Sequence, residues 1–152
     1  MVNTLPARAV LGFACAALSV LTFHQGMLGL LHVLAIPGLE IAATPWRIIP
    51  VPPFGVPLIL NLCFWGGLYG VLFGILAPSM TWPNWLNGLL VGLLAMLVSY
   101  FVVAPIKGNP IGGGWVINNW IRGILINGSF GVGIGLIYPF AAERLLRRPA
   151  TR

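Results

Sequence analysis

Two stretches of this chain decide its fold: LILNLCFWGGLYGVLFGILA at residues 58–77 and WLNGLLVGLLAMLVSYFVVA at residues 85–104. Neither contains a charged residue, and each is about as long as the 20 apolar residues with which an α-helix crosses a bilayer. Each is followed at once by a proline, Pro78 or Pro105, which favours a helix end there. They therefore predict two membrane-spanning helices joined by a short link.

Two further spans flank this pair. Residues 7–34 are uncharged after Arg8, and the helix stop Pro37-Gly38 follows them. This run is longer than the apolar core of about 7–15 residues in a secretory signal, so we expect it to remain in the mature protein. We predict an all-α integral membrane protein, a four-transmembrane-helix bundle forming one domain over residues 1–152. Its expected spans are about 7–34, 58–77, 85–104 and 120–140.

The composition of the whole chain agrees with lipid as its solvent. Hydrophobic residues make up 59% and charged residues only 7%, against about 25% charged in a soluble domain. The mean hydropathy of +0.97 excludes a water-soluble fold. With only two acidic residues, and without a zinc spacing, phosphate loop or nucleophile elbow, the sequence favours a protein that is not an enzyme and has no nucleic-acid partner.

The placement of the basic residues predicts an orientation. Four spans put both termini on one side of the membrane, with five positive charges: Arg8, Arg144, Arg147, Arg148 and Arg152. The other side has three, at Arg47, Lys107 and Arg122. The positive-inside tendency therefore favours cytoplasmic termini in a bacterial inner (cytoplasmic) membrane, with the two longer Pro/Gly-rich connections outside. In the first of these, Glu40 and Arg47 are candidates for an exposed ion pair.

A short repeat relates the second and fourth spans. Residues 67–78 and 128–139 share five identical positions at a constant offset of 61, which favours two repeated helix hairpins of the same orientation. Coincidence in a chain with 20 glycines is the alternative. Glycines also recur every fourth residue, as in helices that approach closely in lipid. Either they close the bundle, or one glycine face docks a partner protein or a second copy. The candidate packing positions are Gly66, Gly70, Gly74, Gly88, Gly92, Gly131 and Gly135.

Polar residues inside the spans fall in the outer half of the expected bundle. Polar side chains in hydrocarbon normally face the bundle interior and pair with one another. The sequence therefore predicts either a hydrogen-bonded cluster that opens outward as a small vestibule, or internal cross-bracing. The candidate members are His24, Gln25, Asn61, Ser99, Tyr100, Arg122 and Asn127.

His24 is the deepest titratable residue of this set, which leaves haem or quinone binding open. His24 and His32 lie about 12 Å apart along one helix, so they cannot ligate opposite faces of a single haem. A haem at His24 would need its second ligand from another subunit. No other cofactor and no metal site is expected. Cys15 and Cys63 lie at different depths, which excludes a disulfide between them.

Four phrases carry a resemblance to known proteins: FHQG at residues 23–26, PFGVP at 53–57, CFWGGLYG at 63–70 and APIKG at 104–108. Together they resemble an uncharacterised family of small four-span proteobacterial inner-membrane proteins. The resemblance implies the location and the fold. It implies no activity and no functional residues.

Three functions are compatible with these observations. The first is a non-enzymatic accessory or structural subunit of a larger membrane complex, whose partners are the lipid bilayer and other membrane-protein subunits or copies of itself. The second is a small channel or carrier for ions or small solutes. The third is a haem- or quinone-binding membrane protein that uses His24.

Overall fold

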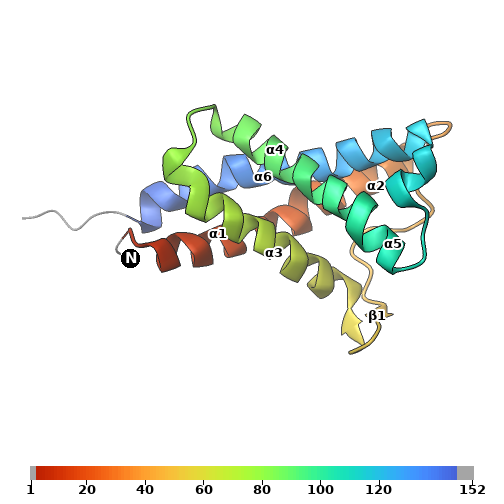
Figure 1. Ribbon diagram of the computed structural model, residues 1–152, viewed down its shortest axis with the longest axis horizontal. Coiled ribbons are helices and arrows are strands. Elements are labelled where there is room, and N and C mark those ends of the chain that lie inside the picture. The colour runs from red at the N-terminus through yellow and green to blue at the C-terminus, as the bar shows by residue number, and fades with distance from the viewer. Residues whose placement is uncertain (1–2, 147–152) are drawn as a thin grey trace, which may run out of the picture.

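The computed structural model describes residues 3–146, and four long helices dominate it (Figure 1). Each is long and apolar enough to cross a membrane, which confirms the expected all-α class with four candidate spans. The first consists of α1 (Leu5–Ser19), the π-helix η1 (Val20–His24) and α2 (Gln25–Leu34), and the second of α3 (Leu58–Leu76) with the 3₁₀ turn η2 (Ala77–Ser79). The third consists of α4 (Asn84–Val98), the π-helix η3 (Ser99–Val103) and α5 (Ala104–Ile106), and the fourth is α6 (Ile117–Leu145).

The two ends of the bundle differ in what they carry. Both described chain ends and the link between α3 and α4 lie at one end, the left of Figure 1, which we call the terminal end. The connections at residues 35–57 and 107–116 lie at the opposite end, the loop end. Arg8 and Arg144 belong to the terminal end, whereas Arg47 and Lys107 belong to the loop end. Arg147, Arg148 and Arg152 of the basic tail lie outside the described residues.

The first long connection is more ordered than an extended chain. Strands β1 (Pro50–Val51) and β2 (Val56–Pro57) pair antiparallel, with Val51 opposite Val56. The Gly55 N–H closes the turn by donating to the Val51 carbonyl at 2.9 Å. In Figure 1 this small hairpin lies off the side of the bundle, beyond the first turn of α3. The second connection contains the 3₁₀ helix η4 (Ile111–Trp115).

Local sequence explains most helix ends. Thr4 caps α1, its hydroxyl accepting from the Ala7 N–H at 3.4 Å. Pro57 and Pro83 stand directly before α3 and α4, where the missing N–H costs no helical hydrogen bond. The fourth helix begins at Ile117, three residues before the expected position, because its polar first turns bind the preceding loop.

The first and third long helices share a feature that the sequence did not predict. In each, a 15-residue α-helix runs into a five-residue π-helix, η1 or η3. A π segment widens the helix and displaces carbonyls from the regular α pattern. In η1 the Leu21 carbonyl accepts a hydrogen bond from the Trp46 indole at 2.9 Å, so this segment anchors the first connection.

The four helices form two tight antiparallel hairpins, α1 with α3 and α4 with α6, and α1 also packs on α6. In the first hairpin a Cβ added at Gly70 would lie 2.1 Å from the Gly12 carbonyl oxygen. In the second, a Cβ added at Gly131 would lie 2.2 Å from the Gly88 carbonyl oxygen. Gly70 of α3 and Gly131 of α6 are related by the offset of 61 in the sequence repeat, so the two contacts are equivalent.

The same equivalence holds one turn further along each hairpin. A Cβ at Gly74 would lie 2.3 Å from the Arg8 carbonyl oxygen, and a Cβ at Gly135 would lie 2.2 Å from that of Asn84. Six buried positions of the first long helix also recur in the third at an offset of 76. They are 11, 12, 15, 16, 19 and 20, matched by 87, 88, 91, 92, 95 and 96. The repeated packing therefore extends to helices whose sequences differ.

The two hairpins meet along a mostly apolar core. Phe73 and Ile134 are fully buried there, and Tyr138 packs edge-on against Phe73 with the ring centroids 5.4 Å apart. Hydrogen bonds also join the hairpins: the Ser19 hydroxyl donates to the Phe130 carbonyl at 2.6 Å, and the Tyr138 hydroxyl donates to the Gly74 carbonyl at 3.4 Å. The core leaves the terminal half of the bundle closed by apolar side chains.

We expect Gly70→Ala and Gly131→Ala to destabilise the fold by similar amounts, because each methyl would collide with a backbone carbonyl of the partner helix. Overpacking of this kind costs about 1–3 kcal/mol. The measurement is unfolding in detergent, followed by circular dichroism. Gly26→Ala is the matched control, since a Cβ there meets nothing within 4 Å. Equal stability of Gly70→Ala and the control would contradict the packing.

Candidate functional site

A left-handed glycine turn organises one side of the loop end. Gly112, Gly113 and Gly114 have φ of +62°, +62° and +69°, a conformation that glycine adopts without strain. The first turn of α6 binds this turn through two side chains. Asn119 donates from its amide to the Gly113 carbonyl at 2.7 Å, and the Trp120 indole donates to the Gly112 carbonyl at 2.9 Å.

Arg122 joins this turn to the first connection. Its guanidinium donates to the Asn119 side-chain oxygen and to the Glu40 backbone carbonyl, the latter at 2.9 Å. Its Nε donates to the Asn118 carbonyl at 3.3 Å. The Tyr100 hydroxyl, from η3, donates to the Asn119 carbonyl. One cation therefore ties together the connections at residues 35–57 and 107–116.

Four aromatic rings cover this network. Trp115 stacks on Trp120 with the ring centroids 6.1 Å apart, and Tyr100 meets Trp120 edge-on at 5.6 Å. Phe101 contacts both tryptophans edge-on. The rings shield the hydrogen bonds beneath them from competing water, which strengthens them.

Gln25 and Trp46 organise the other side of the loop end. The Gln25 side chain is 2% exposed, and its oxygen accepts from the Trp46 backbone N–H at 2.7 Å. Its amide nitrogen lies 3.2 Å from His24 Nδ1, and the His24 ring meets Phe130 edge-on. Trp46 has a φ of +53°, a left-handed conformation that is strained for a residue with a Cβ. Its two hydrogen bonds, to Gln25 and to Leu21, hold it there.

The structure thus brings together some of the candidate polar residues and separates others. Tyr100 and Arg122 share one network, and His24 and Gln25 share another. Asn127 donates to the Gly123 carbonyl of its own helix at 3.0 Å. The side chains of Asn61 and Ser99 form no hydrogen bond with residues 3–146. Over the described residues, the seven candidates do not form one hydrogen-bonded cluster.

Several important residues of these networks were not among the candidates. Asn118, Asn119, Trp120 and Trp46 lie at the edges of the expected spans, where polar and aromatic residues are common for many reasons. The three consecutive glycines before Asn119 were the available signal, because successive left-handed residues need side-chain donors to hold their carbonyls. The indole that binds η1 gave no comparable signal, since the π-helix itself was not predicted.

The two histidines serve different elements. His32 Nδ1 lies 2.7 Å from the Ile41 carbonyl, so His32 pins the start of the first connection. Among the described residues, no group of three or more His, Cys, Asp or Glu could hold a metal ion. Cys15 and Cys63 are both free thiols, and the Cys63 thiol donates to the Ala17 carbonyl at 3.8 Å.

Arg47 stays outside both networks. Within residues 3–146 it forms no ion pair with Glu40, so the expected pairing was wrong. The physical reason is that Glu40 lies against α6, where Arg122 binds its carbonyl, while Arg47 lies beside α3, where its own carbonyl accepts from the Ile59 N–H at 3.2 Å.

Protein-family models, curated proteins and solved structures offer no match to this chain. What its residues can do chemically therefore follows from the geometry above. Four polar side chains at the loop end, those of His32, Asn119, Trp120 and Arg122, bind backbone carbonyls of the connections. They brace the loops, and this use leaves these four less available to a reacting molecule.

We expect Arg122→Gln to loosen both connections while the helices stay intact, because it removes the charged bond to the Glu40 carbonyl and the bond to Asn119, whose amide holds the glycine turn. Such bonds contribute about 1.5–3 kcal/mol each. Hydrogen exchange of the amides at residues 36–42 and 112–116 should accelerate at least about tenfold on that basis. Lys107→Gln, at an exposed loop position, is the control. Unchanged hydrogen exchange in Arg122→Gln would show that the Arg122 hydrogen bonds do not stabilise the two connections.

Proposed function

We propose that this chain is a non-enzymatic multi-pass protein of the bacterial inner membrane that serves as an accessory or structural subunit of a larger membrane complex. One observation carries the proposal. Asn119, Trp120 and Arg122 bind the chain's own carbonyls, and the turn between α5 and α6 that they support exposes apolar side chains. Such a surface suits binding to another protein better than chemistry.

The location in a membrane has two supports besides the four apolar helices. Large apolar side chains face outward along α3, where water would be an unfavourable solvent: Leu60, Phe64, Trp65, Leu68, Leu72 and Leu76. In the sequence, five basic residues fall on the side expected for the two termini and three on the other side, which favours cytoplasmic termini.

The packing argues against a channel. At Gly12 and Gly70, and again at Gly88 and Gly131, backbones touch backbones and leave no room for a path between the helices of a hairpin. Between the hairpins, Phe73 and Ile134 are fully buried. An ion crossing this core would meet apolar side chains and would lose its hydration without compensation. We infer that the glycine faces hold the bundle together and are not free for a partner.

The turn between α5 and α6 is the surface we assign to a partner subunit. Ile106 is 80% exposed, Ile117 is 69% exposed and Trp115 is 68% exposed. Ile111 and Val116 are also exposed on the same turn. The Asn119 and Trp120 hydrogen bonds fix its backbone, so binding there would order little additional chain.

The orientation predicts the behaviour of reporter fusions. A fluorescent protein fused at the C-terminus should fluoresce, because it stays in the cytoplasm. Alkaline phosphatase fused after Asn109 should be active, because the second connection faces outward. The reverse pattern would place the termini outside and remove the proposed orientation.

The subunit assignment predicts that Ile106→Ser with Ile117→Ser releases the chain from its complex. We expect the wild-type chain, extracted from its native membrane in mild detergent, to migrate in native gels well above its 16.3 kDa monomer, and the double variant to migrate as the monomer. Val33→Ser with Ile48→Ser is the matched control, because these residues are 78% and 75% exposed elsewhere at the loop end.

Three results would argue against this assignment. A monomeric wild-type chain in native extracts would remove the partner. Proton or ion flux in proteoliposomes above that of empty vesicles would favour the channel or carrier. A co-purifying haem or quinone that His24→Ala abolishes would favour the third function.

A further inference from the structure

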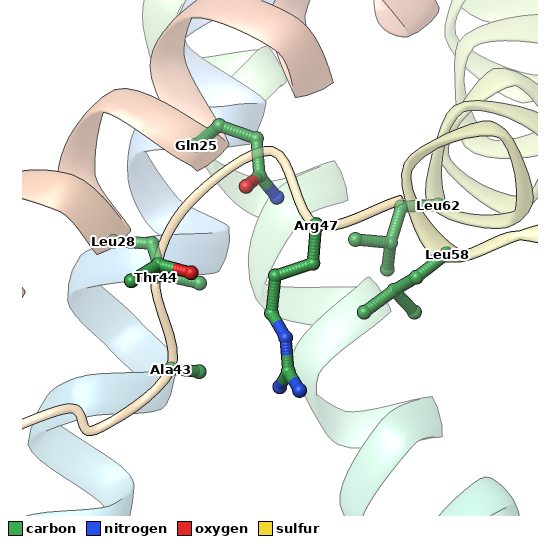
Figure 2. Close-up of a pocket in the computed structure, with 7 residues that line it drawn as sticks. All are labelled: Gln25, Leu28, Ala43, Thr44, Arg47, Leu58 and Leu62. Carbon is green, nitrogen blue, oxygen red and sulfur yellow. The ribbon is translucent and has the colours of Figure 1, made fainter. Parts of the chain in front are cut away.

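A cleft at the loop end combines one cation with an apolar wall. It has a volume of about 60 Å³ and lies between α2, the first connection and the first turns of α3 (Figure 2). A shallower recess of about 430 Å³ adjoins it and shares Ala43, Thr44 and Arg47. The cleft is lined by Gln25, Leu28, Ala43, Thr44, Arg47, Leu58 and Leu62.

Arg47 supplies the charge of this cleft. Figure 2 shows its side chain extending into the space between Thr44 and Ala43 on one side and Leu58 and Leu62 on the other. Within the described residues its guanidinium has neither a hydrogen bond nor an ion pair. Arg47 is exposed, and a guanidinium beside apolar side chains favours an anion that can accept several of its N–H groups at once; phosphate is such an anion.

The backbone around Arg47 is held from both sides. On the α2 side, the strained Trp46 is fixed by the buried Gln25 and by the Leu21 carbonyl. On the α3 side, the Ile59 N–H donates to the Arg47 carbonyl at 3.2 Å. The Leu58 N–H donates to the carbonyl of Ile49, two residues after Arg47, at 2.9 Å. A strained residue kept in place by a buried amide marks a position that the fold specifies closely. Arg47 is therefore presented in a defined place.

The apolar wall sets the chemistry of the rest of the ligand. Leu58 and Leu62 are one helical turn apart, so they stack along the same face of α3. They run from the level of Arg47 toward the middle of the helix, and Leu28 faces them from α2. In a membrane, this is the boundary between headgroups and hydrocarbon. A molecule with a phosphate at one end and an acyl chain at the other fits both parts of the cleft.

We propose that this cleft binds one phospholipid of the outer leaflet. Its phosphate lies against the Arg47 guanidinium and the Thr44 hydroxyl, and one acyl chain follows Leu58 and Leu62. The proposal rests on the membrane location and orientation of the proposed function. Free phosphate would satisfy the cation but would leave the leucines uncovered, so the lipid is the source of phosphate that matches the whole cleft.

The test is lipid retention by the purified full chain. The test compares four proteins: wild type, Arg47→Gln, Arg47→Lys and Lys107→Gln. Each is reconstituted in vesicles that contain phosphatidylglycerol, phosphatidylcholine and diacylglycerol. The protein is then extracted in mild detergent, and native mass spectrometry measures the mass of the lipid that stays bound. We expect wild type and Lys107→Gln to keep one phospholipid and no diacylglycerol. Arg47→Gln should lose about tenfold or more of the bound lipid, the effect of one charged hydrogen-bonding partner, and Arg47→Lys should keep part of it.

A second variant tests the support of Arg47. Trp46→Phe keeps an aromatic ring but removes the indole N–H that binds Leu21, so phospholipid retention should fall several-fold although Arg47 is unchanged. Leu136→Ala, at an exposed position of α6 remote from the cleft, should retain lipid as wild type does. Circular dichroism shows whether each variant is folded before its lipid is compared.

Four outcomes would overturn the proposal. They are full retention by Arg47→Gln, an equal loss in Lys107→Gln, retention of diacylglycerol as strong as that of phospholipid, and displacement of the lipid by inorganic phosphate. The first and second would mean that the cleft has no specific role, the third that only acyl chains bind, and the fourth that the site takes a soluble anion. The reporter fusions are read independently, so a failure of the membrane orientation is distinguishable from a failure of the cleft.

Discussion

The close approach of helix backbones at Gly12 with Gly70, and at Gly88 with Gly131, is the constraint on which the rest of the structure depends. In lipid, burial of apolar side chains gives little drive for helices to associate, because the lipid tails are equally apolar. Close van der Waals contact has to supply the attraction, and it is strongest where no side chain separates the backbones. The two hairpins form around these contacts, and α1 then brings the hairpins together by packing on α6.

The second constraint is that polar groups at the loop end must be satisfied inside the chain. The left-handed glycine turn exposes carbonyls that Asn119 and Trp120 bind. The π-helix η1 presents the Leu21 carbonyl that Trp46 binds. Arg122 then connects the two loops through Glu40 and Asn119. These bonds make a rigid cap on the bundle, and they use most of the groups that catalysis or transport would have required.

The proposed functions follow from these two constraints: glycine contacts hold the helices together, and polar side chains hold the loops. The turn between α5 and α6 exposes Ile106 and Ile117, and we assign this surface to a partner. Within the described residues Arg47 stays outside these networks, because hydrogen bonds fix its backbone while its guanidinium is unpaired beside Leu58 and Leu62. In our proposals, lipid acts on this protein both as the solvent of the helices and as a ligand of the cleft.

The sequence by itself determined the helices. Uncharged apolar stretches such as residues 58–77 can only be helical in lipid, where every backbone group needs an internal partner, and prolines and glycines mark their ends. It also indicated the repeat between the second and fourth helices. The tertiary structure decided what each polar side chain does. Residues 40 and 47 are close in the chain, yet Glu40 lies against α6 and Arg47 beside α3, because loop paths depend on long-range hydrogen bonds that no local pattern encodes. For the same reason, the hydrogen bond between the Trp46 indole and its carbonyl partner in η1 became visible only once the fold brought together a loop and a helix 25 residues apart in sequence.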